Sequence, residues 1–513
     1  MFRDLECLKQ YAEVDPVEAQ SLISWRSPIV LLKKKDSPGR PGLAKGLNAG
    51  LNLLGVMLPY LPLHHMLFRS LTTDAIVLTS GNFSSEPILI DNQVALKQFS
   101  PFVDAIILHN RDIYNRTDDS VVRVIDGKER IFRRSRGYVP TPVRTALHTE
   151  GIVAFGAELT NCFCVGKGQK AFLSQHIGDL QGIETTTFYE KTIAQFLGLF
   201  RVTPALIAVD MHPDYISTKT GLQWGDLPVV RVQHHHAHIA ACMAEYKLDE
   251  KVIGIALDGS GYGTDGNIWG AEFLVCDLND FTRMTHFEYT PLPGGDLATE
   301  EPWRMAVSWL YKVFGSSFTA MEMPFLKHID PYKIGLITRM IDKNINCPLT
   351  SGAGRLFDTV ASLLDLVQVA TFQAEGPMRL ESIARHDCTG SYPYTLSQTI
   401  MFGETIRGIV EDIGKGLDKA TIAAKFHNTI ISAIFNTTNA IRLKEGINKA
   451  VLSGGVFQNK YLLEGTTKIL QQHHFEVYSH ATVPTNDGGI ALGQLAVAAK
   501  RRELLCVWPS PQK

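Results

Sequence analysis

Short apolar runs alternate along the chain with clusters of glycine, proline and polar residues, a pattern typical of α/β proteins. Residues 28–32 (Pro-Ile-Val-Leu-Leu) and 75–78 (Ala-Ile-Val-Leu) are apolar runs of strand length, and both predict buried strands. Residues 151–155, 252–257 and 450–452 predict three more strands, each of which runs directly into a glycine-containing turn. From Thr421 onward apolar residues recur with helical spacing and predict a helix with a buried face formed by Ile422, Phe426, Ile430, Ala433 and Ile434.

The chain changes character near residue 140, where Tyr138-Val139-Pro140-Thr141-Pro142 carries two prolines. Prolines restrict the backbone and suit a linker, so we place a domain boundary there. The length of 513 residues agrees with more than one domain, because a single hydrophobic core stops growing at roughly 250–300 residues. We therefore predict an α/β protein with at least two cores and more than one sheet.

Composition and charge exclude several classes of protein. Hydrophobic residues make up 45% of the chain and charged residues 20%, which is typical of a globular protein and not of a disordered one. With 50 Lys and Arg against 52 Asp and Glu, the net charge of −2 gives no general attraction to nucleic acid or anionic lipid, and we expect neither as a partner. The most apolar long segment, residues 47–68, contains prolines, asparagines and histidines that a lipid-exposed helix would not bear.

The cell compartment is predicted from the N-terminus and the cysteines. The first residues, Met1-Phe2-Arg3-Asp4-Leu5-Glu6, are charged where a signal peptide would need an apolar core. Eight cysteines are scattered without a CxxC motif, which argues against a disulfide framework and against a thiolate zinc site. We therefore expect a reduced, cytoplasmic protein.

The densest chemical signal is His234-His235-His236-Ala237-His238, which places four of the 17 histidines within five residues. In a helix, His234 and His238 lie on one face, where two imidazole nitrogens can bind one metal ion. A site of nitrogen and oxygen ligands suits iron, zinc, manganese or magnesium. Asp487, which precedes an apolar helix, is the preferred third ligand. The alternative is a set of ordinary histidines and an aspartate that caps a helix.

Glycine turns form a second group. Backbone N–H groups in such turns can approach an anion closely, and Asp258-Gly259-Ser260-Gly261, Ser453-Gly454-Gly455 and Asp487-Gly488-Gly489 together suggest a nucleotide site. Asp258 would hold a metal ion or its bound water near the phosphates, or would only cap its turn. No P-loop motif is present.

A third group combines residues 79–82 (Thr-Ser-Gly-Asn) with residues 118–120 (Asp-Asp-Ser) and 133–136 (Arg-Arg-Ser-Arg). Hydroxyl, amide and guanidinium groups suit a substrate that carries a phosphate and a carbonyl. The alternative is a set of turns and a solvated strand edge.

Several motifs together resemble the HypF carbamoyltransferase family of hydrogenase maturation. They lie at residues 174–180 (SQHIGDL), 212–215 (HPDY), 232–238 (VQHHHAH), 257–266 (LDGSGYGTDG), 301–304 (EPWR), 354–358 (GRLFD) and 453–459 (SGGVFQN). The resemblance therefore covers nearly the whole chain.

The resemblance implies two catalytic units. Residues 1–140 resemble part of a YrdC-like domain, which in this family joins a carbamoyl group to AMP; its nucleotide or carbamoyl contacts would be Ser80, Asn82, Ser120 and Arg133. After a linker at residues 141–150, residues 151–290 and 291–513 resemble the two lobes of a metal-dependent transferase domain with the fold of actin-like ATPases.

By the same resemblance, His234, His238 and Asp487 are the metal ligands, and His234, His238 and Asp258 are catalytic. The residues implied to contact the nucleotide are Asp258, Gly259, Asp358, Gly455 and Asn459. The family's acylphosphatase domain and its CxxC-containing zinc region have no counterpart in this sequence, and Met1 matches a point inside the YrdC-like domain. We therefore expect a truncated form of a longer enzyme that retains transfer from ready-made carbamoyl adenylate.

The implied activity is carbamoyl transfer. ATP and carbamoyl phosphate would give carbamoyl adenylate, and the acceptor would be the C-terminal cysteine of the protein HypE, in synthesis of the cyanide ligand of nickel–iron hydrogenase. The implied cofactors are ATP or AMP and a divalent metal ion (iron, zinc or magnesium). Two alternatives are an O- or N-carbamoyltransferase that acts on a small molecule, and a non-catalytic, ATP-switched binding protein of the actin-like fold.

Overall fold

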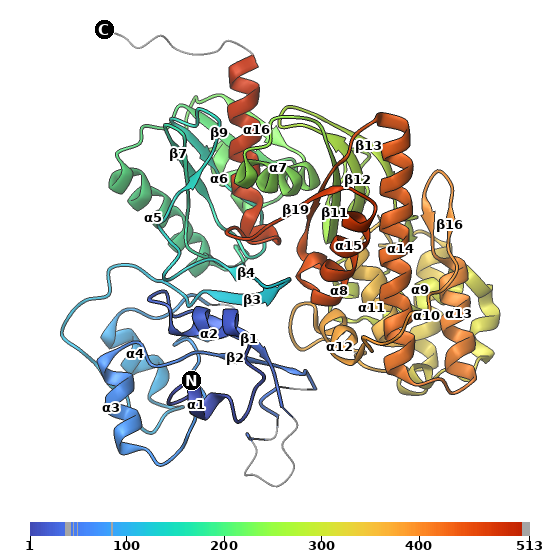
Figure 1. Ribbon diagram of the computed structural model, residues 1–513, viewed down its shortest axis with the longest axis horizontal. Helices are drawn as coiled ribbons and strands as arrows, with labels where there is room; N and C mark the ends of the chain where they lie inside the picture. Colours follow the sequence, from blue (N-terminus) through green and yellow to red (C-terminus); the bar gives the residue numbers. More distant parts are fainter. Residues whose placement is uncertain (36–42, 45, 49, 84–85, 505–513) are drawn as a thin grey trace. The chain divides into compact units, whose positions relative to one another are not determined.

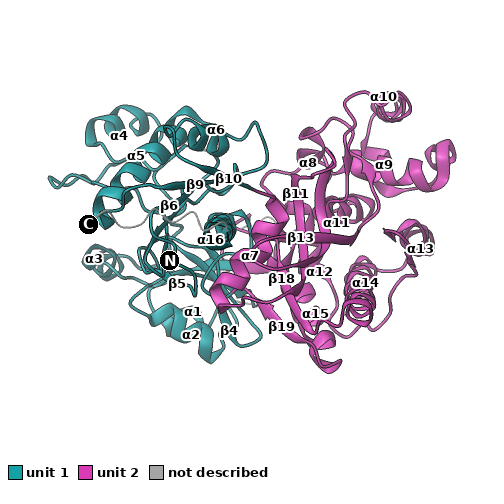
Figure 2. Ribbon diagram, turned by 90° about the horizontal axis from the view of Figure 1, so that it is seen from above, with its two compact units in different colours: residues 1–40, 54–231, 481–513 teal, residues 41–53, 232–480 magenta. Residues whose placement is uncertain are grey.

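The computed structural model describes residues 1–35, 43–44, 46–48, 50–83 and 86–504 (Figure 1). The chain forms two compact units, coloured separately in Figure 2. Unit 1 comprises residues 1–40, 54–231 and 481–513, and unit 2 comprises residues 41–53 and 232–480. Both units combine helices with mainly mixed sheets, so the predicted α/β class is confirmed.

The first part of unit 1 is built on a four-stranded sheet with the order β2-β1-β3-β4. Its strands are β1 (Ile29–Lys33), β2 (Leu53–Val56), β3 (Val121–Ile125) and β4 (Lys128–Arg133). Its helices are α1 (Leu5–Leu8), α2 (Pro16–Ile23), α3 (Pro62–Ser70) and α4 (Asn92–Phe99). Strand β1 confirms the strand predicted at residues 28–32, and its side chains Val30 and Leu32 are fully buried.

The strand predicted at residues 75–78 is wrong. Ala75 makes a single bridge to Phe2, and Val77 is 69% exposed. An apolar run forms a buried strand only when neighbouring strands cover it. The described residues provide no more pairing here than the bridge at Phe2.

The second part of unit 1 is a six-stranded sheet with the order β10-β9-β6-β7-β8-β5. Its strands are β5 (Val143–Arg144), β6 (Ile152–Ala154), β7 (Cys164–Lys167), β8 (Lys170–Leu173), β9 (Leu206–Asp210) and β10 (Val229–Val232). Helices α5 (Ile183–Phe200), α6 (Ile216–Leu222) and α16 (Ile490–Leu504) accompany it, and α16 packs against β6 and β9. Its core includes Val153, Phe163 and Tyr189. Strand β6 confirms the strand predicted at residues 151–155.

Unit 2 is built on a seven-stranded sheet with the order β14-β15-β12-β11-β18-β19, in which β13 also pairs with β12. Its strands are β11 (Val252–Tyr262), β12 (Ile268–Cys276), β13 (Phe281–His286), β14 (Thr290–Pro291), β15 (Leu349–Thr350), β18 (Lys449–Ser453) and β19 (Glu476–Ser479). A separate hairpin is formed by β16 (Thr395–Leu396) and β17 (Ile400–Met401). The strands predicted at residues 252–257 and 450–452 are confirmed.

The helices of unit 2 include the one that the sequence predicted from Thr421 onward. They are α7 (His234–Tyr246), α8 (Leu297–Glu300), α9 (Trp303–Phe314), α10 (Pro331–Asp342), α11 (Ala353–Leu363), α12 (Glu375–Ile383), α13 (Gly403–Gly414), α14 (Lys419–Glu445) and α15 (Lys460–Gln472). Helix α14 begins where Asp418 caps the backbone N–H of Thr421 and ends at Gly446, which has a left-handed conformation. The predicted apolar face of α14 is buried.

Strands β11, β12 and β13 share one sheet with β18 and β19, so residues 252–286 and residues 449–479 belong to the same sheet. The predicted domain and lobe boundaries stay predictions. The predicted linker at 141–150 contributes β5 to the six-stranded sheet, where Val143 pairs with Ala171. Among the described helices, none is both long enough and apolar enough to cross a membrane.

Candidate metal and nucleotide site

The histidine cluster forms the first turn of α7. The side chain of Gln233 accepts a hydrogen bond from the backbone N–H of His236 at 2.9 Å and so caps the helix at its N-terminus. His234 and His238 are one turn apart, their ring centroids are 5.0 Å apart, and both side chains are buried. The helical geometry that the sequence predicts for this pair is confirmed.

Asp258 lies opposite the two histidines. It occupies an irregularity in β11, where the register against β12 shifts between Leu257 and Gly261. Its Oδ2 is 3.4 Å from Nε2 of His234 and 3.3 Å from Nε2 of His238. The ligand atoms of these three residues all lie within 4.8 Å of one another. Two imidazole nitrogens and a carboxylate oxygen are a donor set that fits a divalent cation.

Charge in this cluster is concentrated on Asp258. Burial on its own raises the pKa of this carboxyl, but hydrogen bonds from His234 and His238 outweigh burial and hold the pKa well below its ordinary value. Asp258 is therefore an ionised carboxylate at neutral pH, as a metal ligand must be.

The other two histidines of the cluster have different partners. His235 Nδ1 is 3.2 Å from the side-chain amide of Gln233. His236 Nε2 is 2.7 Å from the carbonyl oxygen of Asp277. Within this group, His234 and His238 are the residues whose Nε2 atoms lie within 3.4 Å of Asp258.

Asp487 lies in unit 1, in the short helix η4 (Asp487–Gly489) that runs into α16. The side chain of Asn486 caps this turn by accepting the backbone N–H of Gly488 at 3.1 Å. The predicted place of Asp487 directly before an apolar helix is confirmed, and its role as a further metal ligand stays a prediction.

Two glycine turns pack tightly around Asp258. Gly454 has φ +100°, and a Cβ at this position would lie 2.2 Å from the carbonyl oxygen of Leu257, so only glycine fits. The next residue, Gly455, donates its backbone N–H to Asp258 Oδ1 at 3.2 Å. The predicted turn at 453–455 is thus in contact with the predicted catalytic aspartate.

Arg355, for which the sequence predicts no role, points toward the glycine turn that directly follows Asp258. A Cβ at Gly259 would lie 3.4 Å from Arg355 Nη2. Arg355 Nη1 is 3.1 Å from Asp358 Oδ2, and Arg355 Nε is buried without a hydrogen-bond partner among the described residues. Desolvation raises the pKa of Asp358 to about 6, although the charge of Arg355 acts to lower it.

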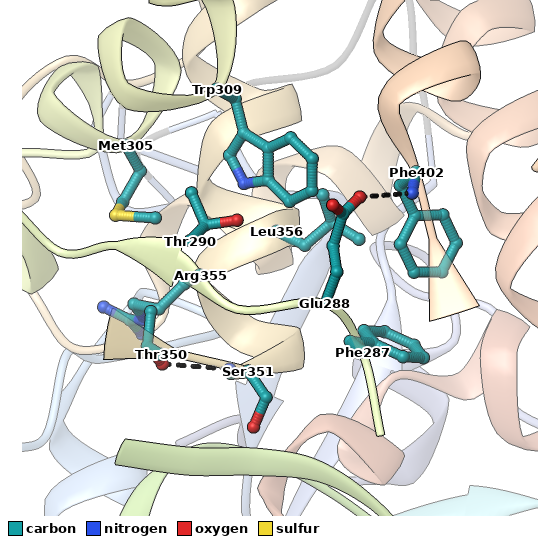
Figure 3. Close-up of a pocket in the computed structure, with 11 residues that line it drawn as sticks. Phe287, Glu288, Thr290, Met305, Trp309, Thr350, Ser351, Arg355, Leu356 and Phe402 are labelled. Carbon is teal, nitrogen blue, oxygen red and sulfur yellow. Dashed lines mark hydrogen bonds between the residues drawn. The ribbon is translucent and has the colours of Figure 1, made fainter. Parts of the chain in front are cut away.

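Figure 3 shows Arg355 beside Thr350 and Ser351 in the wall of a small cavity that has room for about one water molecule. The opposite wall is mainly apolar and includes Trp309 and Phe402. A guanidinium with free N–H groups beside a glycine turn is suited to bind an anion. The sequence alone did not indicate that Arg355 could bind an anion, since an arginine in the first turn of a helix is common on solvated surfaces.

A buried carboxylate holds two segments of this region together. Glu272 in β12 is fully buried and accepts hydrogen bonds from Ser351 Oγ and from Arg283 Nε, both at 2.6 Å. The backbone N–H of Gly270 is a third donor, at 3.1 Å. Ser351 lies two residues before the start of α11, which carries Arg355 and Asp358, so Glu272 fixes this end of the helix against the sheet.

Asn459, a predicted nucleotide contact, has two contacts within the protein. Its Oδ1 accepts the backbone N–H of Leu462 and caps α15, and its Nδ2 donates to Nε2 of the buried His427; both distances are 2.9 Å. Contact with a nucleotide therefore stays a prediction for Asn459.

The four residues predicted to bind substrate in the first part of unit 1 lie in two places. Ser80 donates to Asn82 Oδ1, and Asn82 donates to the carbonyl oxygens of Phe83 and Glu86. Ser120 is fully buried, accepts the backbone N–H of Ser135 and donates to the carbonyl oxygen of Arg136. Arg133 lies in β4. Ser120 thus has a structural role here, and substrate contact by these four residues stays a prediction.

Comparisons with known proteins agree with this arrangement. The profile described as "Carbamoyltransferase, Kae1-like Domain, second subdomain" matches residues 254–494, and the profile described as "HypF Kae1-like domain" matches residues 147–245. A third profile, Sua5_yciO_yrdC, described as "Telomere recombination", matches residues 1–135. Carbamoyltransferase HypF of Synechocystis sp. is 36% identical over 527 residues, which cover 99% of this chain and 67% of the relative. The chain belongs to the HypF carbamoyltransferase family.

Other HypF proteins give the same result. Carbamoyltransferase HypF of Rhizobium leguminosarum bv. viciae is 37% identical over 97% of this chain and 65% of its own length, so the chain spans about two-thirds of such relatives. A crystal structure of full-length HypF in the phosphate- and nucleotide-bound form is 46% identical, with a TM-score of 0.92 over 98% of this chain and 79% of the other. HypF of T. kodakarensis has a TM-score of 0.91 at 35% identity. The predicted fold, a YrdC-like domain followed by a transferase domain with two subdomains, is confirmed.

Proposed function

We propose that this chain transfers a carbamoyl group from carbamoyl adenylate to the C-terminal cysteine of HypE, as a step in making the cyanide ligand of nickel–iron hydrogenase. The observation that carries the proposal is the buried cluster of His234, His238 and Asp258 in the Kae1-like part of a HypF-family chain. Chemistry on an acyl phosphate needs charge stabilisation and a nucleotide site, and both are supported by the residues around Asp258.

The donor set fits a divalent cation such as iron, zinc or magnesium, held by His234, His238 and Asp258, with Asp487 as the further ligand that we propose from the family resemblance. A cation bound there would polarise the carbamoyl oxygen or hold the phosphate of the adenylate. The ionised carboxylate of Asp258 is in the state that metal binding requires, and a cation would take the place of the protons that now link both imidazoles to it.

The residues around the cluster would bind the nucleotide. The turns at Gly259 and Gly455 bring backbone close to Asp258, and Arg355 would donate its free N–H groups to a phosphate oxygen. Nucleotide and phosphate bound to the HypF relative of known structure support ATP or AMP as the ligand. Asp358 would keep Arg355 oriented through their ion pair.

In the proposed step, the thiolate of the acceptor cysteine attacks the carbamoyl carbon. A carbon–sulfur bond forms, the bond between that carbon and the phosphate oxygen breaks, and AMP leaves with the electron pair. The product is a thiocarbamate on HypE. In the family resemblance the YrdC-like domain joins the carbamoyl group to AMP, and the step proposed for this chain starts from ready-made carbamoyl adenylate.

Mass spectrometry of intact HypE tests the proposal. HypE is incubated with the chain and synthetic carbamoyl adenylate, and in parallel with ATP and carbamoyl phosphate. The proposal predicts the added mass of one carbamoyl group with carbamoyl adenylate, and none on HypE whose C-terminal cysteine is replaced by serine. Unmodified HypE alongside carbamoylated small-molecule acceptors would contradict the choice of acceptor, and AMP release without any acceptor product would contradict carbamoyl transfer.

A further inference from the structure

Behind the 453–455 turn, three buried side chains form a hydrogen-bonded chain that the proposed reaction does not use. Ser453 Oγ is 2.8 Å from His480 Nε2, and His480 Nδ1 is 3.2 Å from Glu245 Oε2. Ser453 is fully buried, and the side chains of His480 and Glu245 are 2% and 7% exposed. We call Ser453, His480 and Glu245 the relay.

The direction of the hydrogen bonds follows from their chemistry. An ionised carboxylate can only accept a hydrogen bond, so Nδ1 of His480 carries a hydrogen and donates it in a hydrogen bond to Glu245. Nε2 of a neutral imidazole is then an acceptor, and the hydroxyl of Ser453 donates to it. Both nitrogens of His480 are therefore engaged, and the Ser453 hydroxyl has one defined orientation.

The relay connects separate segments of unit 2. Glu245 lies in the last turn of α7, the helix whose first turn carries His234 and His238. Ser453 is the last residue of β18, and His480 directly follows β19; all three elements are labelled in Figure 2. The hydroxyl of Tyr246 donates to the carbonyl oxygen of Ser479 at 2.8 Å and reinforces the same junction.

The two residues after Ser453 connect the relay to Asp258. Gly454 is packed against Leu257 with no room for a side chain, and Gly455 donates its N–H to Asp258 Oδ1. The other carboxylate oxygen, Oδ2, faces both histidines. A shift of Ser453 would therefore move the N–H group that orients Asp258.

Serine, histidine and glutamate in this order are also the pattern of a nucleophilic triad. Full burial of Ser453 leaves no path for a substrate to reach its hydroxyl in this arrangement, which argues against a nucleophile. A buried carboxylate that is paired and hydrogen-bonded is suited instead to fix the relative positions of the segments it joins.

We propose that Glu245, His480 and Ser453 are positioning residues for the candidate metal site. They hold the 453–455 turn in register with α7, so that Asp258 is aimed at His234 and His238. The inference rests on the proposed function only in treating this cluster as a metal site. Residues that orient metal ligands from the outer shell change metal affinity by about 10–100-fold when they are removed.

Titration of the full chain with Mn²⁺, followed by calorimetry, tests the relay. Ser453→Ala removes the hydroxyl and is expected to weaken Mn²⁺ binding about tenfold. Glu245→Gln keeps an amide oxygen that can accept the proton of Nδ1, and its affinity is expected to stay closer to that of the wild type. The matched control is Ser308→Ala, since Ser308 is equally buried and donates to the carbonyl oxygen of Pro291 at 2.7 Å away from the relay.

The inference is overturned if Ser453→Ala binds Mn²⁺ within twofold of the wild type, or if Ser308→Ala weakens binding as much. Should Ser453→Ala fail to fold in a thermal scan, His480→Asn takes its place with the same expected loss, because the asparagine amide can replace the Nδ1 donor toward Glu245 but is too short to reach Ser453. A wild-type chain that binds Mn²⁺ but transfers no carbamoyl group contradicts the proposed function alone. A wild-type chain that binds no divalent cation overturns the role of the relay as well.

Discussion

Replacing Gly261 by alanine would test whether the candidate metal site depends on close packing of β11 against α7. A Cβ at Gly261 would lie 2.6 Å from Cδ2 of His234 and 2.7 Å from Cε1 of His235. Ordinary contact begins at 3.4 Å, so the ring of His234 would have to move by about 0.8 Å, the difference between 3.4 and 2.6 Å. Both rings are fully buried, so the surrounding core would have to move with them.

The displacement sets the expected size of the effect. Metal–ligand distances are held within roughly 0.2 Å, and a shift of about 0.8 Å is several times larger. We therefore expect Gly261→Ala to weaken Mn²⁺ binding by at least about tenfold and to lower stability by about 1–3 kcal/mol through overpacking. No ligand atom is removed, so the loss would report on geometry alone.

Calorimetric titration with Mn²⁺ and urea unfolding measure the two effects. Gly335→Ala is the matched control, since Gly335 lies within α10 and a Cβ there meets nothing within 4 Å. This control should bind Mn²⁺ as the wild type does and gain roughly 0.5–1 kcal/mol of stability. A folded Gly261→Ala chain with unchanged Mn²⁺ affinity would refute the reasoning.

Three further predictions concern the region around α11. Arg355→Ala should weaken ATP binding about tenfold or more, which corresponds to the loss of one charge-assisted hydrogen bond of roughly 1.5–3 kcal/mol. Calorimetry should show unchanged binding of adenosine, which has no phosphate. An equal loss of affinity for both ligands would place Arg355 away from the phosphates. Burial raises the pKa of Asp358 to about 6, so folding favours the protonated carboxyl. The resulting contribution of Asp358 to the free energy of unfolding is fully present below pH ~4, and it is lost as the pH rises through the folded-state pKa. Urea unfolding should therefore show the stability of the wild type falling relative to Asp358→Asn between those pH values, and a constant difference would argue against a raised pKa. Glu272→Ala should cost about 3–5 kcal/mol in urea unfolding, because it leaves the charge of Arg283 without its buried partner; a loss below about 1 kcal/mol would contradict this structural role.

Local patterns in the sequence predicted much of the fold. The spacing of Ile422, Phe426 and Ile430 predicted α14, and the spacing of His234 and His238 predicted their shared helix face, because both depend only on helical periodicity. The apolar run at Ala75 was misjudged, since burial depends on which strands are adjacent and the run itself does not specify them. The pairing of β11 with β18, which lies almost 200 residues further along the chain, was not predicted for a similar reason.

Contacts between distant residues were beyond prediction from sequence. Asp258 was expected to contact the nucleotide and to hold a metal ion or its water, but its nearly equal approach to both histidines became visible only when β11 was placed beside α7. Glu245 and His480 are separated by 235 residues, and no motif links them. The family resemblance pointed to His234 and His238, which lie beside Asp258 in the structure, but it did not indicate how their orientation is maintained.

The central claim is that the cluster of His234, His238 and Asp258 supports carbamoyl transfer. The most direct measurement is the rate at which intact HypE gains a carbamoyl group from synthetic carbamoyl adenylate. This rate is compared among the wild type, the double variant His234→Ala/His238→Ala, and the control His65→Ala, which changes an exposed histidine in unit 1. The account predicts full transfer with the wild type and with His65→Ala, and none above the uncatalysed rate with a folded double variant. Transfer by the double variant at the wild-type rate would contradict it.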